Sequence, residues 1–364
     1  MSVLYDEGQL AIADASLRVL DARMSMDRLL SCLEHTGRFD EVFWRTAVEQ
    51  GWTALTIPEE HDGLGLGLLE LGLVAQAAGT HTSGAPFLTT GFGAGRALVN
   101  AGCSELNALW LPRLMSGEAV MTVALVQGGT PLPEDCNVVL EDDRITGVCR
   151  MVTGGLQADA AVVWTRHGEQ PALALVELNH AERKAANSHD NSRLYADITF
   201  AAAPARLLAS GQDARRIGLD MLAAMGVVTA HEQLGGAEAL LHRTRDYALT
   251  RKAFGQPIGA FQSIKHRIAE LYALIEIARA NCIHASSRDS APDFVIAAAD
   301  ARITATQAYD TAARDCIQIH GGIGATWEQG LHLHLRRARS LAVEQGNLMF
   351  WEDVVVDRLV KAAS

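Results

Sequence analysis

The spacing of hydrophobic and polar positions changes twice along the chain, and the three patterns predict three structural parts. Up to about residue 115, apolar residues recur at helical spacing. From about residue 121, short β-like runs alternate with clusters of Gly, Pro, Asp and Asn, which is typical of a small antiparallel sheet or barrel. Beyond about residue 203 the helical spacing returns. We therefore predict an α+β protein with an all-helical domain over residues 1–117, a middle β domain over 118–203 and a C-terminal helical bundle over 204–364.

Several individual helices have recognisable ends. Asp40 is a typical N-cap for a helix over Glu41–Gln50, and Gly79 is expected to end a helix that begins at Leu68. Pro86 predicts a break before a short helix over Arg96–Ala101. Two long helices are expected later, one that runs into Arg251 and one over Val295–Ile319. No G-x-G-x-x-G follows a predicted strand, which argues against a nicotinamide cofactor.

Composition and charge narrow the class of protein. The chain has 364 residues, a hydrophobic fraction of 49% and a net charge of −12, with a pI near 5.5. This acidic balance argues against sequence-independent binding of nucleic acid and against an anionic membrane surface. There is no run of 18 apolar residues and no basic region at the start, so the sequence predicts a soluble, cytoplasmic protein.

Cysteine and histidine residues give no sign of a metal centre. The six cysteines are scattered without C-x-x-C spacing, so reduced, buried thiols are expected. His332 and His334 are two residues apart, and on a helix such side chains point in nearly opposite directions. Ligand spacing therefore predicts no metal site.

The stretch Arg251–Glu270, RKAFGQPIGAFQSIKHRIAE, joins a loop rich in Gly and Pro to a strongly amphipathic helix. A guanidinium at Arg251 can fork onto phosphate oxygens, and Phe254 offers an aromatic ring beside it. Gln262 offers an amide at the start of the next helix, where free N–H groups favour an anion. Taken singly, each of these residues is equally well explained by solvation or ordinary packing.

A second stretch, Gln318-Ile-His-Gly-Gly-Ile-Gly-Ala-Thr-Trp-Glu, ends a long helical segment, and its glycines let backbone approach a ligand closely. In this order, and separated by one long helix pair, RKAFGQPIGAFQ and QIHGGIGATWE resemble the flavin-binding signatures of the acyl-CoA dehydrogenase family. The segment from Ile57 to Leu66, IPEEHDGLGL, resembles a turn in the N-terminal domain of that family. The resemblance covers essentially the whole chain.

The resemblance implies an acyl-CoA dehydrogenase-like fold and FAD as the cofactor. The positions that match the family's flavin-binding motifs are Arg251, Phe254, Gln262, Gln318, Gly321 and Gly322. It further implies α,β-dehydrogenation of an acyl-CoA thioester, an electron-transfer flavoprotein as acceptor, and a homo-oligomer or a heterotetramer with a related dehydrogenase subunit. The family's middle domain usually opens with a Thr/Ser and Gly-rich loop that touches the flavin. Here residues 123–130, VALVQGGT, depart from that pattern.

Such a dehydrogenation needs a carboxylate to take the α-proton of the thioester. In the family this base commonly lies in a Tyr-Glu-Gly-Thr tetrapeptide, which falls here on Glu344-Gln345-Gly346-Asn347. A gap-free alignment puts Gln345, whose amide is no base, at the base position and Glu344 one residue early. Glu344 is our candidate base if the preceding loop differs by one residue. Glu232 is an alternative, and a chain without its own base is the third.

The resemblance includes bacterial acyl-CoA dehydrogenases that degrade steroid side chains, and these enzymes illustrate the third alternative, a chain without its own base. In these enzymes two unlike subunits pair and only one type carries the base. On this alternative, the chain is a non-catalytic partner that completes another chain's flavin site. An acyl-CoA oxidase or flavin monooxygenase on the same fold is a further alternative. Met225, Val228 and Thr229 are expected to face the acyl chain, and a thioether at Met225 favours a branched or ring-bearing acyl group.

Overall fold

The computed structural model describes residues 4–82, 86–127 and 129–363. The N-terminal part consists of helices that pack on one another and on the long helix α7. Their bounds are α1 Glu7–Arg23, α2 Met26–Glu34, α3 Glu41–Glu49, α4 Leu68–Thr80, α5 Phe87–Ala101 and α6 Ser104–Met115, with two short 3-10 turns, η1 Trp52–Ala54 and η2 Glu59–His61. Within the described ranges, no helix is long and apolar enough to cross a membrane.

The helix starts predicted at Glu41 and Leu68 are confirmed. The Asp40 carboxylate accepts a hydrogen bond from the Phe43 N–H at 3.1 Å, which satisfies one of the free donors at the start of α3. The prediction of a short helix after Pro86 was wrong, because α5 begins at Phe87. Glycines within α5 weaken its helical signal, but they are needed for packing: a Cβ on Gly93 would lie 2.3 Å from the sulfur of Met225.

The middle part is a seven-stranded sheet in which β6 pairs with both β4 and β7, so the strand path closes on itself. The strands are β1 Met121–Ala124, β4 Val139–Glu141, β5 Arg144–Val152, β6 Ala160–His167, β7 Gln170–Glu177, β8 Glu182–Ala185 and β9 Ala196–Ser210, beside a small pair, β2 Val126–Gln127 and β3 Thr130–Pro131. Most pairings are antiparallel, as predicted, but β1–β6 and β4–β6 are parallel. Strand β9 runs to Ser210 and so passes residue 203, where the β domain was predicted to end. The sequence did not reveal this extension, because the alanine-rich second half of the strand shows no alternation of apolar and polar residues.

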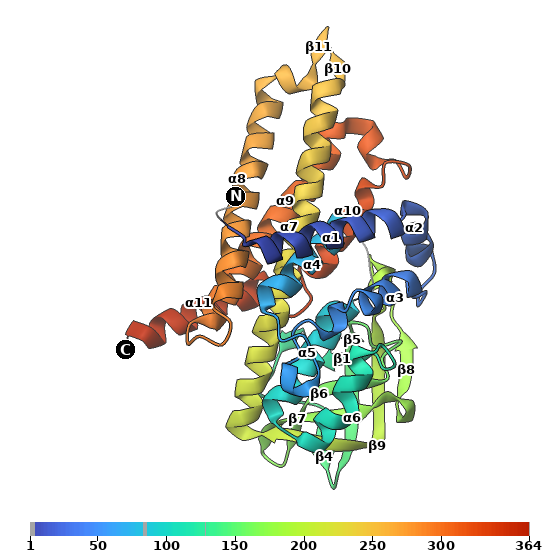
Figure 1. Ribbon diagram of the computed structural model, residues 1–364, viewed down its shortest axis with the longest axis vertical. Helices are drawn as coiled ribbons and strands as arrows, with labels where there is room; N and C mark the ends of the chain where they lie inside the picture. Colours follow the sequence, from blue (N-terminus) through green and yellow to red (C-terminus); the bar gives the residue numbers. More distant parts are fainter. Residues whose placement is uncertain (1–3, 83–85, 128, 364) are drawn as a thin grey trace.

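The C-terminal part is built on α7, Gly211–Thr250, a 40-residue helix that runs through the molecule. Around it lie α8 Gln262–Ser287, α9 Phe294–His320, α10 Leu331–Leu341 and α11 Leu348–Ala363, with 3-10 turns η5 Ile258–Ala260 and η6 Gly321–Ala325 in the connecting segments; two further 3-10 turns, η3 Leu178–His180 and η4 Asn191–Arg193, belong to the middle part. Figure 1 shows α7 and α8 projecting side by side to the small hairpin of β10 (Lys252–Ala253) and β11 (Gln256–Pro257), while α11 projects to one side of the body, at the left in this view.

Close backbone contact joins the N-terminal helices to α7. A Cβ added to Gly79 of α4 would lie 1.9 Å from the carbonyl oxygen of Glu232, and one added to Gly235 of α7 would lie 1.9 Å from that of Gln76. The two helices therefore touch through their main chains at this crossing. This contact fixes the position of Glu232 where the three parts of the chain meet.

Candidate functional site

The first motif forms the tip of the α7–α8 hairpin. Helix α7 ends at Thr250, Arg251 is extended, and the chain turns through Phe254 and Gly255, both at positive φ, which is the geometry of a two-residue type I′ hairpin. Phe254 is 96% exposed, and its ring meets that of Phe261 edge to face at 6.2 Å between centroids. An aromatic residue held in a left-handed conformation and left in solvent points to a surface that another molecule covers.

The second motif lies against the base of this tip. Tyr247, one turn before Arg251, stacks on His320 with 4.1 Å between ring centroids, and its hydroxyl donates to the His320 carbonyl at 3.3 Å. The chain then leaves α9 at Gly321, at positive φ, and a Cβ on Gly321 or Gly322 would meet nothing within 4 Å. The exposed main chain of this glycine turn is therefore open to a ligand.

The structure thus brings the predicted cofactor-binding residues to one exposed end of the molecule. Helix α8 begins at Gln262 without a side-chain cap, and the Ile264 N–H already donates to the Phe261 carbonyl at 3.1 Å, so the N–H groups of Gln262 and Ser263 are the ones left for an acceptor. All six residues are exposed: Arg251, Phe254, Gln262, Gln318, Gly321 and Gly322. A guanidinium, free helix N–H groups and an open glycine turn together fit an extended anion such as a pyrophosphate.

Glu344 lies elsewhere, in the loop after α10, and it is buried. Arg193 donates to both of its carboxylate oxygens, at 3.0 Å to Oε1 and 2.7 Å to Oε2, and the Tyr195 hydroxyl donates to Oε1 at 2.5 Å. Arg193 also approaches Glu232 at 3.5 Å. Glu232 precedes Arg251 by 19 positions on α7, so the carboxylates lie roughly 28 Å from the exposed tip along the helix. A single chain therefore does not unite Glu344 with the predicted cofactor-binding residues.

Glu344 belongs to a buried ion-pair cluster that joins all three parts of the chain. Arg337 of α10 donates to Asp190 at 2.5 Å and to Glu232 at 2.6 Å, and also to the carbonyl of Thr82 at 3.0 Å. Burial disfavours the charged forms of these side chains, but the ion pairs between them favour the charged forms more strongly. Arg337 and its neighbours hold the pKa of Asp190 below its usual range, and Glu344 and Glu232 hold the pKa of Arg193 well above its usual range.

Glu344 and Glu232 were candidates from the sequence, but their partners in this cluster were not predicted. Asp190, Arg193 and Tyr195 come from the segment between β8 and β9, which has no periodic pattern, and Arg337 lies in a helix with several other arginines. The nearest sequence signal is the density of polar residues in DNSRLY, residues 190–195, just before a strand. No spacing rule pairs them with a carboxylate about 150 positions away.

A cavity of about 750 Å³ opens beside Glu344. Its wall is formed by the segment before β9, the end of β5, the end of α10 and the loop after it, with Arg150, Tyr195, Arg339 and Gln345 among the lining side chains. A smaller pocket of about 50 Å³, lined by Leu222 and Met225 of α7, shares Gln345 with the larger cavity. The Gln345 backbone has a φ of 54°, and its side-chain oxygen accepts a hydrogen bond from Thr229 at 3.0 Å.

The loop that carries Glu344 and Gln345 is held through its main chain. Buried Arg302 donates to the carbonyls of Leu341 at 2.8 Å and Glu344 at 3.0 Å. Burial lowers the pKa of this guanidinium to about 10. The loop therefore has a fixed course in which Gln345 lies in the wall shared by both cavities and the oxygens of Glu344 are bound to Arg193 and Tyr195.

The atypical segment of the middle domain is tied into the core. Within residues 123–130, residue 128 lies outside the described part of the chain. The Gln127 amide donates to the Trp164 carbonyl at 2.9 Å, and its oxygen accepts from the Asn137 N–H at 3.0 Å. The polar groups of the Gln127 side chain are therefore hydrogen-bonded inside the protein.

Helices, a middle β domain and a C-terminal helical domain, in this order, form the acyl-CoA dehydrogenase fold. Two family models match: "Acyl-CoA dehydrogenase, N-terminal domain" over residues 6–118 and "Acyl-CoA dehydrogenase, C-terminal domain" over residues 217–359. The chain is 34% identical over 308 residues to acyl-CoA dehydrogenase IpdE2 of Mycobacterium tuberculosis, an alignment covering 84% of this chain and 82% of that protein. The chain belongs to the acyl-CoA dehydrogenase family.

Two solved structures of two-subunit proteins are also similar. One is a variant of the Tcur3481-Tcur3483 steroid ACAD, 25% identical with a TM-score of 0.88, covering 98% of this chain and 99% of that one. The other is the ChsE4-ChsE5 complex from Mycobacterium tuberculosis, 24% identical with a TM-score of 0.89, covering 99% of both chains. The fold and family expected from the two sequence motifs are therefore confirmed.

Proposed function

We propose that the chain is a subunit of an FAD-dependent acyl-CoA dehydrogenase that assembles with a related dehydrogenase chain. The observation that carries the proposal is the separation of the exposed tip from the cavity beside Glu344. Because roughly 28 Å of helix lies between them, the tip serves a cofactor that another subunit presents. Members of the family bind FAD, which accepts the hydride in the dehydrogenation.

On the protein side, Arg251 and the N-terminus of α8 would hold phosphate oxygens of the FAD, and the turn at Gly321 and Gly322 would let the cofactor approach the main chain. Phe254 would cover an apolar part of it. The electron-transfer flavoprotein is the acceptor that this proposal implies. None of these roles requires a residue of the buried ion-pair cluster.

Whether Glu344 acts as the catalytic base depends on whether this chain or the related chain supplies the base. Glu344 remains the candidate base of this chain, since it lines the larger cavity. Its Oε1 accepts from both Arg193 and Tyr195 and its Oε2 accepts from Arg193, which leaves little capacity to accept a substrate proton. The neighbouring cavity position is an amide, Gln345. These contacts favour a base supplied by the related chain.

The substrate that we propose is a CoA thioester with a bulky, ring-bearing acyl group. Three observations support this class: the cavity of about 750 Å³, the adaptable thioether of Met225 in the small pocket that shares Gln345 with this cavity, and the likeness to a protein described as a steroid ACAD. A short straight acyl group would leave most of this volume unfilled.

The test is anaerobic reduction of bound flavin by a panel of CoA thioesters, from butyryl to palmitoyl and including a steroid side-chain example. The chain is assayed alone and after co-expression with a related dehydrogenase chain, each as wild type and as Glu344→Gln. We expect flavin reduction only by the co-expressed assembly, fastest with the ring-bearing thioester, and little changed by Glu344→Gln. A loss of about 100-fold or more in that variant would make Glu344 the base. Fast reduction by straight-chain thioesters with this chain alone would contradict the proposal.

A further inference from the structure

Gln345 is held in an uncommon backbone conformation. Its φ of 54° lies in the left-handed region, which a residue with a side chain adopts rarely and at an energetic cost. The contacts on either side impose this conformation, because Arg302 donates to the carbonyl of Glu344 at 3.0 Å and to that of Gly346 at 3.4 Å. Strained residues of this kind are concentrated at ligand-binding and catalytic sites, where the direction of a side chain matters.

The side-chain amide of Gln345 is oriented as well. The Thr229 hydroxyl donates to the amide oxygen Oε1 at 3.0 Å, so the two N–H bonds of Nε2 are left for other acceptors. Within the part of the chain that the structure describes, no group accepts from Nε2, although Gln345 is only 7% exposed. Gln345 borders both the cavity of about 750 Å³ and the pocket of about 50 Å³. An occupant of either space can therefore accept from Nε2.

The wall shared by the two cavities offers few other donors. The side chains that border both spaces are, besides Gln345, Val126, Arg150, Met151 and Thr153. Two of these are apolar, and the Arg150 guanidinium is paired with Asp197 at 2.8 Å. Thr153 carries a hydroxyl, which can donate or accept. Gln345 therefore gives this wall a neutral donor in a fixed orientation.

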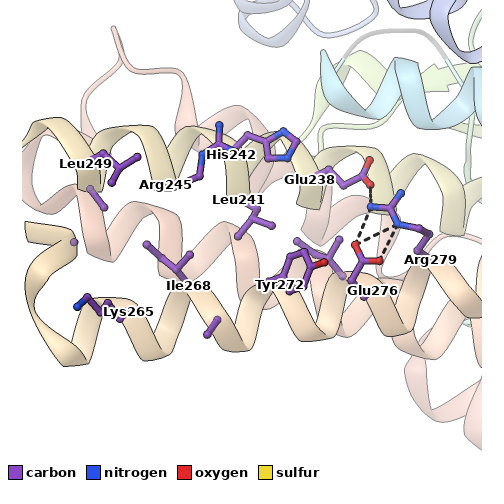
Figure 2. A pocket seen from close by; sticks show the side chains of 14 residues that line it. Glu238, Leu241, His242, Arg245, Leu249, Lys265, Ile268, Tyr272, Glu276 and Arg279 are labelled. Atoms are coloured by element: carbon purple, nitrogen blue, oxygen red, sulfur yellow. Dashed lines mark hydrogen bonds and ion pairs between the residues drawn. The ribbon is translucent and has the colours of Figure 1, made fainter. Parts of the chain in front are cut away.

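The groove of about 420 Å³ between α7 and α8 shows the opposite arrangement (Figure 2). There Arg279 is paired with both Glu238 and Glu276, as the dashed lines in Figure 2 show. The donors of this guanidinium are used within the chain. The N–H groups of Gln345 differ because they have no such partner.

The surroundings of the Gln345 amide are otherwise apolar on the side of the small pocket, where Leu125, Leu222 and Met225 line the space. A donor in an apolar wall favours a ligand that carries an oxygen atom at that point. A ligand without an acceptor displaces water and leaves the N–H groups unpaired, which costs binding free energy. The wall can therefore distinguish ligands that differ by one oxygen atom.

We propose that Gln345 donates a hydrogen bond to a carbonyl oxygen of the bound CoA thioester and thereby selects the substrate. The carbonyl belongs to the thioester itself or to the ring-bearing part of the acyl group, and the experiment below separates these two sources. An amide binds such an oxygen but takes no proton from the substrate. The inference rests on the proposed function, because it requires that the cavity beside Glu344 accept a CoA thioester.

Calorimetric titration of the full chain with three CoA probes tests the inference, and it requires no flavin turnover. S-(2-cyclohexylethyl)-CoA is a thioether without an acyl oxygen, cyclohexylacetyl-CoA has the thioester oxygen alone, and (4-oxocyclohexyl)acetyl-CoA adds a ring oxygen. Gln345→Met removes the donors and keeps a side chain of similar length. Gln212→Met, at an exposed position of α7, is the matched control and should change none of the three affinities.

We expect Gln345→Met to weaken binding of an oxygen-bearing probe by about 3- to 10-fold and to leave the affinity for the thioether within about twofold. A loss confined to the 4-oxo probe assigns the accepted oxygen to the ring, and an equal loss for both thioesters assigns it to the thioester. Thr229→Val keeps Gln345 but removes its tether, so it should give a smaller loss for the same probes. If Gln345→Met yields no folded protein, the comparison in Thr229→Val decides.

Two results would overturn the inference while leaving the proposed function intact. One is a wild-type chain that binds the thioesters and a Gln345→Met variant that binds them equally well. The other is a Gln345→Met variant that loses affinity for the thioether as much as for the thioesters, since this pattern reports a structural change alone. A wild-type chain that binds none of the three probes would contradict the proposed function, and the inference with it.

Discussion

Arg193 is the residue on which the buried carboxylates most directly depend. Its guanidinium binds both oxygens of Glu344 and approaches Glu232, and all three side chains are buried. A buried ion pair adds little compared with an apolar replacement of both partners, but removing one partner leaves an uncompensated charge in the interior. The cluster is therefore sensitive to any change of one member.

Replacing Arg193 with Met should lower the free energy of unfolding by roughly 3–5 kcal/mol, because Glu344 then loses both donated hydrogen bonds. Chemical denaturation followed by circular dichroism measures the change. The matched control is Arg216→Ala, at an exposed arginine of α7, which should alter stability by less than about 0.5 kcal/mol. Adding Glu344→Gln to Arg193→Met should recover part of the loss. A loss below about 1 kcal/mol in Arg193→Met would mean that the cluster contributes little.

At the residue scale, the sequence predicted the exposed tip better than the buried cluster. The motifs around Arg251 and Gly321 are contiguous stretches, so their residue types and spacing can be recognised before any fold is known. The partners of Glu344 are Arg193 and Tyr195, about 150 positions away, and only the packed fold brings them together. The orientation of Gln345 into the cavity wall depends on a positive φ that no pattern of apolar residues encodes.

At the scale of elements, the crossing of α4 and α7 is the contact that positions Glu232. The main chains of the two helices meet at Gly79 and Gly235, where no Cβ fits. Within a helix, Gly→Ala is ordinarily stabilising by about 1 kcal/mol, because alanine has the higher helix propensity. Here the direction should reverse.

Gly79→Ala should destabilise the protein by roughly 1–3 kcal/mol, since the added methyl would lie 1.9 Å from the Glu232 carbonyl oxygen and the helices must separate. Gly8→Ala is the control, at an exposed position of α1 where the added Cβ would meet only the Asp6 side chain, at 3.3 Å. It should be neutral or stabilising. Thermal unfolding of both variants provides the comparison, and a stable Gly79→Ala protein would show that the crossing can relax.

Elements with strong local signals were predicted and others were not. The N-cap at Asp40 and the long apolar faces of α7 and α9 allowed the positions of α3, α7 and α9 to be predicted to within a few residues. Helix α5 was underestimated because its glycines serve tertiary packing against Met225 at the expense of helix propensity. The second half of β9 was missed because it reads as an alanine-rich segment, and its strand pairing with β5 and β7 is not local.

At the scale of the whole molecule, the motifs predicted to bind the cofactor and the cavity lie apart. The exposed tip carries Arg251, Phe254 and the free N-terminus of α8, and the cavity beside Glu344 lies roughly 28 Å away along α7. The motifs predicted a flavin-binding family, but no sequence pattern could show this separation. It is the separation that makes the neighbouring subunit part of the proposed site.

The most direct test of the central claim is the FAD content of the co-expressed assembly when Arg251 is replaced by Ala in this chain alone. We predict about 10- to 100-fold weaker FAD binding, with unchanged assembly and an unchanged melting temperature, because a charge-assisted contact to phosphate is lost at an exposed position. Arg216→Ala is the control and should retain its FAD. Full FAD occupancy in Arg251→Ala, with the affinity of the wild-type assembly, would contradict the account.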